Sequence, residues 1–196
     1  MEKVKSYILL IVVMAISFVA NAEETEEPII IKKGLLRTQM TISPAILFKS
    51  KQAFFYLHGN LEGYINKKIS VSGDAFFSVG NIAAVAPTFK FNHSIFFGAA
   101  YHFTKRNNDF YLGLQPGISI TKLNLLSDDL QRAKTGVNPI VAVVLGYNYY
   151  VHKYFHFFVQ TRFIAGQHLY NTRKDLSEFR FSAGLGFNIN ALKKKE

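Results

Sequence analysis

His93 and Ser94 are the only adjacent histidine and serine in the chain, which makes them the first candidates for chemistry. A serine nucleophile needs a base within hydrogen-bonding reach, and usually a carboxylate that orients the base. The residues around this pair alternate between apolar and polar types, which is the pattern of a β-strand, where successive side chains point to opposite faces. His93 and Ser94 therefore cannot act as a dyad. The sequence predicts no catalytic residues and a protein that is not an enzyme.

Three further histidines, His102, His152 and His156, are candidates for metal binding because imidazole is a common zinc ligand. They fall on different segments and no carboxylate accompanies them, so they need not converge. We expect them to form hydrogen bonds or to lie at an interface. The sequence predicts neither a metal site nor any other cofactor.

Charged residues inside otherwise apolar segments form the third group. They share the polar face of those segments and are the expected lumen polar network: Arg37, Glu62, Asp74, Arg162 and Arg180. The same face is expected to carry Gln39, His58, Lys68, Gln115 and Gln160. Charges in a narrow interior must be paired or hydrated. Two interpretations stay open: a plug of salt bridges and hydrogen bonds, or a gated pore selective for cations or anions.

The elements that position these residues are long segments with a two-residue period. In 89–103 the odd positions are nearly all apolar and the even positions are mostly polar or small, and 110–121 and 179–190 repeat this pattern. Five further segments fit more loosely: 35–48, 53–65, 68–80, 137–151 and 154–166. Lengths of about 12–15 residues exceed the ~5–6 of ordinary strands and suffice for the ~9–11 that cross a bilayer. The sequence therefore predicts eight membrane-spanning β-strands.

The connections between these segments alternate in length. The short ones are 66–67, 104–109 and 152–153, and the longer ones are 81–88, 122–136 and 167–178. The connection 49–52 is an exception, an outer loop that is short. Outer-membrane barrels have short periplasmic turns and longer outer loops, so both termini are expected on the periplasmic side. Charged residues of the outer loops are candidates for surface contacts: Asp128, Asp129, Arg132, Lys134, Arg173 and Lys174.

The N-terminal residues have the pattern of a cleaved secretory signal peptide. Lys3 and Lys5 precede an apolar run over 7–19, and Ala20-Asn21-Ala22 has the small-x-small form of a cleavage site. The expected division is a signal peptide at 1–22, an N-terminal leader at 23–34, the barrel at 35–190 and a basic C-terminal tail at 191–196.

Composition limits the partners. The net charge is +10, yet the basic residues are spread over turns, loops and the C-terminus, so nucleic acid is not an expected partner. Phosphates of outer-membrane lipids are the more suitable partners for these lysines and arginines. The chain has no cysteine, so disulfides cannot stabilise the exported protein.

The two strand faces distinguish a membrane barrel from a soluble, lipocalin-like cup. The polar face is rich in Gly, Ser, Ala and Asn, which suit a narrow interior filled by side chains, and the apolar face is large and almost uncharged. Aromatic residues near the strand ends suggest two interfacial girdles. The inner one is Tyr64, Phe103, Phe110, Tyr147, Tyr149 and Tyr154, and the outer one is Phe48, Phe77, Phe89 and Phe179. The predicted fold is all-β, an antiparallel eight-stranded up-and-down transmembrane β-barrel.

With its signal peptide, eight strands and loop parity, the chain resembles the small OmpA/OmpX-type outer-membrane β-barrel family. In the last strand, residues Ser182–Ile189 also resemble the C-terminal signal read by the barrel-assembly machinery, although Ile189 stands where an aromatic is usual and the chain continues past it. The resemblance implies a bacterial outer-membrane location and that machinery as a partner in biogenesis. It does not extend to a peptidoglycan-binding domain, which does not follow the barrel.

The expected function is a non-enzymatic structural or surface-interaction role in the cell envelope, with a surface partner that the sequence does not identify. The first alternative is a narrow porin-like channel for ions or small solutes. The second is a lipid-modifying outer-membrane enzyme, although the lipid A deacylase pattern, with His and Ser two apart on one face, is not found.

Overall fold

Long β-strands dominate the computed structural model, which describes residues 31–82, 88–124, 135–170 and 173–191. The strands are β1 (Leu35–Leu47), β2 (Ala53–Tyr64), β3 (Ile69–Ile82), β4 (Phe89–Lys105), β5 (Asn108–Leu123), β6 (Gly136–His152), β7 (Phe155–His168), β8 (Lys174–Asp175) and β9 (Glu178–Asn190). Among the described residues no helix is long and apolar enough to span a membrane.

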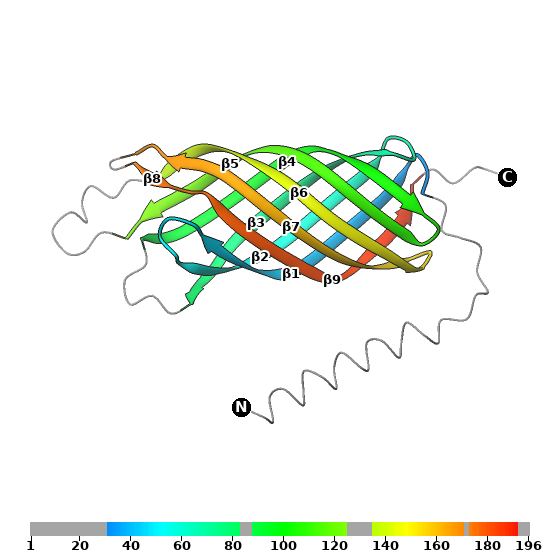
Figure 1. Cartoon of the computed structure of the whole chain (residues 1–196), viewed down its shortest axis with the longest axis horizontal. Coiled ribbons are helices and arrows are strands. Elements are labelled where there is room, and N and C mark those ends of the chain that lie inside the picture. The colour runs from blue at the N-terminus through cyan, green and yellow to red at the C-terminus, as the bar shows by residue number, and fades with distance from the viewer. Residues whose placement is uncertain (1–30, 83–87, 125–134, 171–172, 192–196) are drawn as a thin grey trace, which may run out of the picture.

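The eight long strands close into an antiparallel barrel (Figure 1). Each of β1 to β6 pairs with the next strand along the chain. The last long strands complete the circle, because β7 pairs with β9 and β9 pairs with β1. The two-residue strand β8 extends one end by pairing with the last residues of β7. The predicted fold, an eight-stranded antiparallel up-and-down barrel, is confirmed.

The two ends of the barrel differ in their connections (Figure 1). At the end where β1 begins and β9 finishes, the connections are the short turns 65–68, 106–107 and 153–154, and we name this the turn end. At the opposite loop end they are 48–52, 83–88, 124–135 and 169–177. The predicted signal peptide and the loop residues Asp128, Asp129, Arg132 and Lys134 lie outside the described residues.

Two-residue alternation explains the barrel wall. In β5 the side chains of Phe110, Leu112 and Leu114 are exposed, whereas those of Tyr111 and Gln115 are buried inside. The outer wall therefore carries large apolar side chains on every long strand, some highly exposed, such as Met40 at 70%. Soluble proteins rarely expose contiguous apolar surface on this scale, so the wall suits a lipid environment.

Three positions differ from the expectation. Phe89 was expected in the outer girdle but is buried, because a register shift between Phe89 and Phe91 reverses the facing of the first residue of β4. Tyr64 was expected in the inner girdle but is buried, because it shares the facing of Glu62 two residues earlier. Lys68 was expected inside the barrel but is exposed, because it lies in a turn and not in a strand.

Candidate functional site

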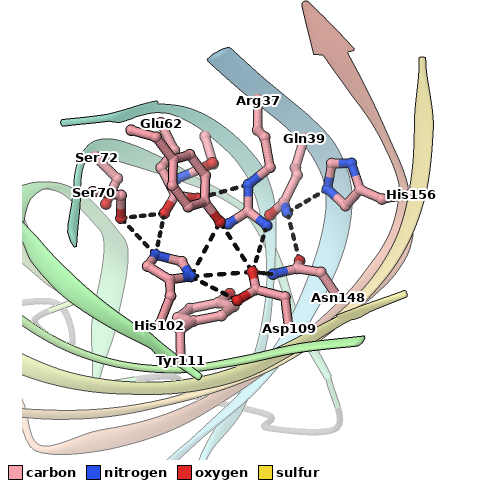
Figure 2. Close-up of polar contacts among 12 residues, drawn as sticks. Arg37, Gln39, Glu62, Ser70, Ser72, His102, Asp109, Tyr111, Asn148 and His156 are labelled. Atoms are coloured by element: carbon pink, nitrogen blue, oxygen red, sulfur yellow. Dashed lines mark hydrogen bonds and ion pairs between the residues drawn. The ribbon is translucent and has the colours of Figure 1, made fainter. Parts of the chain in front are cut away.

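Side chains that meet inside the barrel form the candidate site. At the turn end, Arg37 from β1 lies between two carboxylates: Glu62 from β2 and Asp109 from β5. The Nε of Arg37 donates to Glu62 Oε2 at 3.1 Å, and its Nη1 is 3.3 Å from Asp109 Oδ2. His102 from β4 is placed between the same two carboxylates, with Nε2 3.1 Å from Glu62 Oε1 and Nδ1 3.0 Å from Asp109 Oδ1. Figure 2 shows these four side chains pointing toward one another.

Neutral groups complete the hydrogen bonding of this cluster. The Tyr64 hydroxyl donates to Asp109 at 2.9 Å, the Asn148 amide donates to the same carboxylate at 3.0 Å, and Arg37 donates to the Tyr150 hydroxyl at 3.0 Å. Ser70 donates to Glu62. We name the whole group the turn-end network: Arg37, Glu62, Tyr64, Ser70, His102, Asp109, Asn148 and Tyr150. Buried charges are tolerated when they are paired and hydrogen-bonded in this way.

A second group, the middle network, surrounds Asp74 on β3. Asp74 is 2.8 Å from His58 Nε2, forms an ion pair of 2.9 Å with Arg162, and accepts a hydrogen bond of 2.9 Å from the Gln115 amide. Gln115 also donates to Ser72 and accepts from Arg162. Three other strands, β2, β5 and β7, supply the groups around this one carboxylate, so the network ties opposite sides of the barrel together.

A third group, the loop-side network, surrounds Glu178 on β9. Arg180 pairs with Glu178 and also donates to the Ser94 hydroxyl at 2.7 Å. The Tyr56 hydroxyl donates to Glu178 at 3.0 Å, and Asn92 donates to both Tyr56 and Glu178. The Arg180 guanidinium carbon lies 4.0 Å from the Tyr56 ring centre, in the range of a cation–π contact.

Apolar side chains fill the rest of the lumen toward the loop end. We name them the loop-end cluster: Ala45, Leu47, Phe54, Tyr56, Phe76, Phe89, Phe96, Leu123, Ile140, Ala142, Ile164 and Leu176. Phe76 reaches between the networks, with the guanidinium carbons of Arg162 and Arg180 lying 5.0 Å and 4.4 Å from its ring centre. The aromatic ring therefore lies against both arginines, which carry like charges.

Little space is left between these groups. A cavity of about 10 Å³ lies between the turn-end and middle networks, where its lining includes Glu62, Asp74 and Arg162. About one water molecule needs ~10–15 Å³ by this measure. Among the described residues, side chains therefore occupy the lumen at the turn end, in the middle and toward the loop end.

Ser70, His102 and Asp109 superficially match the pattern of a hydrolytic triad. The Ser70 hydroxyl is 2.8 Å from His102 Nε2, and His102 Nδ1 is 3.0 Å from Asp109. Both ring nitrogens of His102, however, contact carboxylates, and the Ser70 hydroxyl donates to Glu62 instead of to the imidazole. Ser70 is also fully buried, so substrate cannot reach it. The arrangement holds charge and does not present a nucleophile.

The structure places the remaining histidines apart from any metal-type cluster. His156 is buried and contacts Gln39 at 2.9 Å, whereas His152 is half-buried at the end of β6. No group of three or more metal-ligating side chains occurs among the described residues. His93 and Ser94 face opposite sides of the wall, with Ser94 buried and His93 half-exposed.

All five residues of the expected lumen network are buried inside the barrel, but they divide among three separate groups. Arg37 and Glu62 meet at the turn end, Asp74 and Arg162 meet in the middle, and Arg180 lies on the loop side. Of the expected loop residues, Arg173 and Lys174 are exposed at the loop end.

Sequence reasoning missed two carboxylates that neutralise these arginines. The predicted connections 104–109 and 167–178 include Asp109 and Glu178 as turn and loop residues. A usable signal was present, because each lies an even number of residues before a residue expected in the interior: Asp109 lies six before Gln115, and Glu178 lies two before Arg180. Extending each predicted strand by one residue at its start would have placed both inside.

A closed eight-stranded barrel with an apolar wall and a polar interior defines the fold of the small outer-membrane β-barrels. Three solved structures of this class match most of the chain. Neisserial surface protein A (NspA) matches 78% of this chain and 95% of its own, with a TM-score of 0.56 and 17% identity. The outer membrane protein OprG from Pseudomonas aeruginosa matches 82% and 98%, with a TM-score of 0.61 and 14% identity.

The attachment invasion locus protein Ail of Yersinia pestis matches 80% of this chain and 99% of its own, with a TM-score of 0.52 and 12% identity. No family model matches the chain, and no curated protein matches it in sequence. The predicted resemblance to small outer-membrane barrels is therefore confirmed as a likeness of fold.

Proposed function

We propose that this chain is a non-enzymatic integral protein of a bacterial outer membrane, with a closed lumen and a structural or surface-interaction role. The observation that carries this proposal is the filled interior, where charged networks and an apolar cluster follow one another along the barrel. A lumen closed in this way favours a structural or surface-interaction role over a channel for ions or small solutes. The apolar outer wall supports insertion in lipid.

Export and insertion fit the same proposal. The signal peptide pattern at 1–22 would direct the chain across the inner membrane, where Ala22 would end the cleaved segment. Residues 182–189 then lie on β9, which closes the barrel against β1, so recognition of this strand by the assembly machinery would precede closure.

The loop end is the proposed surface of interaction, because loops on a rigid scaffold commonly carry binding function. Arg173 and Lys174 would contribute from the described part, and Asp128, Asp129, Arg132 and Lys134 from the longest loop. The names of two structurally similar proteins, a surface protein and an attachment invasion locus protein, are consistent with such a role.

Membrane fractionation combined with heat-modifiable gel mobility tests the proposal. We expect the protein in the outer-membrane fraction, and we expect the unheated, folded barrel to migrate differently from the boiled chain. A soluble periplasmic protein without a mobility shift would refute it. Mass spectrometry of lipid A from a deletion strain tests the enzymatic alternative, and we expect the acyl chains to be unchanged.

A further inference from the structure

A cavity at the turn end opens outside the lumen, and His102 of the turn-end network forms part of its lining. Its volume is about 550 Å³, and its lining combines the rim of the barrel with the outer wall. The turn between β2 and β3 supplies Lys67 and Lys68, and the end of β4 supplies Lys105. The exposed rings of Tyr101 and Phe103 form the side that faces outward, and their centres are 5.0 Å apart.

The backbone holds these two segments together. The amide of His102 donates to the carbonyl of Lys68 at 2.8 Å, and Ile69 pairs with Tyr101 in the β3–β4 ladder. The lysines of the turn are therefore fixed beside the aromatic rings, and the closeness does not depend on flexible side chains alone.

Charge at this end is of one sign. The exposed charged residues of the turn end are all basic among the described residues: Lys32, Lys33, Lys67, Lys68, Lys105, Arg106 and Lys153. The acidic residues of this end, Glu62 and Asp109, are buried in the turn-end network and paired with Arg37 and His102. Nothing acidic in the described rim neutralises the lysines around the cavity, so they are available to an anion from outside.

We propose that this cavity binds the phosphate-bearing headgroup of an anionic glycerophospholipid in the periplasmic leaflet. The lysines would contact the phosphate while Tyr101 and Phe103 contact the glycerol and the first acyl carbons. This division follows from the amphipathic character of an interfacial aromatic belt and from the attraction of basic segments to anionic lipid. The inference rests on the proposed outer-membrane location and names a lipid partner for the turn end.

Native mass spectrometry of the full chain tests this inference, with phosphatidylglycerol and phosphatidylcholine offered in equal amounts in detergent. We expect preferential retention of phosphatidylglycerol. The variant K67Q/K68Q/K105Q should retain at least about tenfold less of it, because each basic residue near an anionic surface contributes roughly a fivefold factor in binding. The variant K67R/K68R/K105R keeps the charge and should keep the lipid.

A matched control removes the same charge from the other end. In K49Q/K51Q/K90Q three exposed lysines of the loop end are neutralised, and phosphatidylglycerol retention should not change. Equal retention of the two lipids by the unsubstituted chain, or an equal loss in both glutamine variants, would overturn the inference.

The acidic leader of this chain is a competing occupant, because Ile31 lines the cavity and Glu23, Glu24, Glu26 and Glu27 precede it. If the unsubstituted chain retains no phosphatidylglycerol and neutralising those glutamates restores retention, the leader occupies the cavity and the lipid site is refuted.

The heat-dependent gel shift distinguishes a failure of the lipid site from a failure of the proposed membrane barrel. A shift without selective retention refutes only the lipid site, whereas loss of the shift in the unsubstituted chain refutes the membrane barrel.

Discussion

The two ends of the lumen are closed by different physical means. At the turn end, Arg37 and His102 lie between Glu62 and Asp109, and hydroxyl and amide groups complete their hydrogen bonds. Toward the loop end, a cluster of apolar side chains fills the space beside the ion pair of Glu178 and Arg180. The two kinds of closure contribute differently. The charged networks fix the positions of specific side chains, whereas apolar packing contributes most of the favourable free energy of folding.

This difference has an energetic consequence. Replacing a whole buried ion pair by apolar residues is often neutral, but removing one partner leaves a buried charge without compensation. The charged networks should therefore be more sensitive to single substitutions than to paired ones. The loop-end cluster should respond in proportion to the volume that is removed.

The largest effect is expected from Arg37→Ala at the turn end. The substitution leaves Glu62 and Asp109 buried with only His102 between them, so the free energy of unfolding should fall by about 3–5 kcal/mol. Urea unfolding in detergent micelles, followed by gel mobility, measures this change. Lys153→Ala at the exposed rim is the control and should cost almost nothing, and a loss below about 1 kcal/mol for Arg37→Ala would contradict the pairing of charges inside the lumen.

A somewhat smaller effect is expected from Leu47→Ala in the loop-end cluster. Leu47 is 1% exposed, so the substitution removes apolar contacts and leaves a cavity, at a cost of about 3 kcal/mol. The same unfolding experiment applies, with Met40→Ala on the lipid-facing wall as a comparison in which no cavity forms inside the barrel. Equal losses for the two substitutions would mean that the loop end is not packed as a core.

A paired substitution sharpens the comparison. Arg180→Met alone leaves Glu178 with hydrogen bonds from Tyr56 and Asn92 but no cation, and should be strongly destabilising. Adding Glu178→Met should return the free energy of unfolding to within about 1 kcal/mol of the unsubstituted protein, because apolar residues can replace a buried ion pair. A double variant as unstable as the single one would show that the pair contributes more than charge balance.

The smallest effect is expected at the surface. Lys49 lies 3.4 Å from Asp175 at the loop end, and its side chain is 76% exposed. Lys49→Ala should change the free energy of unfolding by about 0.5 kcal/mol or less, because exposed ion pairs are screened and flexible. Unfolding at low and high salt checks this, and a loss above about 1 kcal/mol would place the pair in a less exposed setting than the structure gives it.

The sequence was sufficient to predict the strands because apolar and polar residues alternate along each of them with a period of two. The predicted segment 179–190 differs from β9 by one residue, and the expected polar interior residues Arg37 and Asp74 are inside. Strand ends were less accurate, since β5 continues two residues beyond the predicted 110–121 at each end. That small error excluded Asp109 from the predicted interior.

The side of the wall to which a side chain points, and its partners inside the lumen, were harder to predict than the positions of the strands. Phe89 reverses because of a bulge, and a bulge depends on how two neighbouring strands pair, which one strand's pattern does not contain. Pairing inside the lumen depends on the stagger of the strands around the barrel. The contact between Arg37 and Asp109, residues on strands that are not neighbours, therefore could not be derived from local sequence.

The central claim is that the lumen is closed, and single-channel recording in planar bilayers tests it most directly. Purified protein that shows the heat-dependent gel shift should give no stable conductance steps, because Arg162, Asp74 and the groups around them fill the middle of the barrel. Stable stepwise conductance that is lost in Asp74→Ala or Arg162→Ala would contradict the closed lumen and favour the narrow channel.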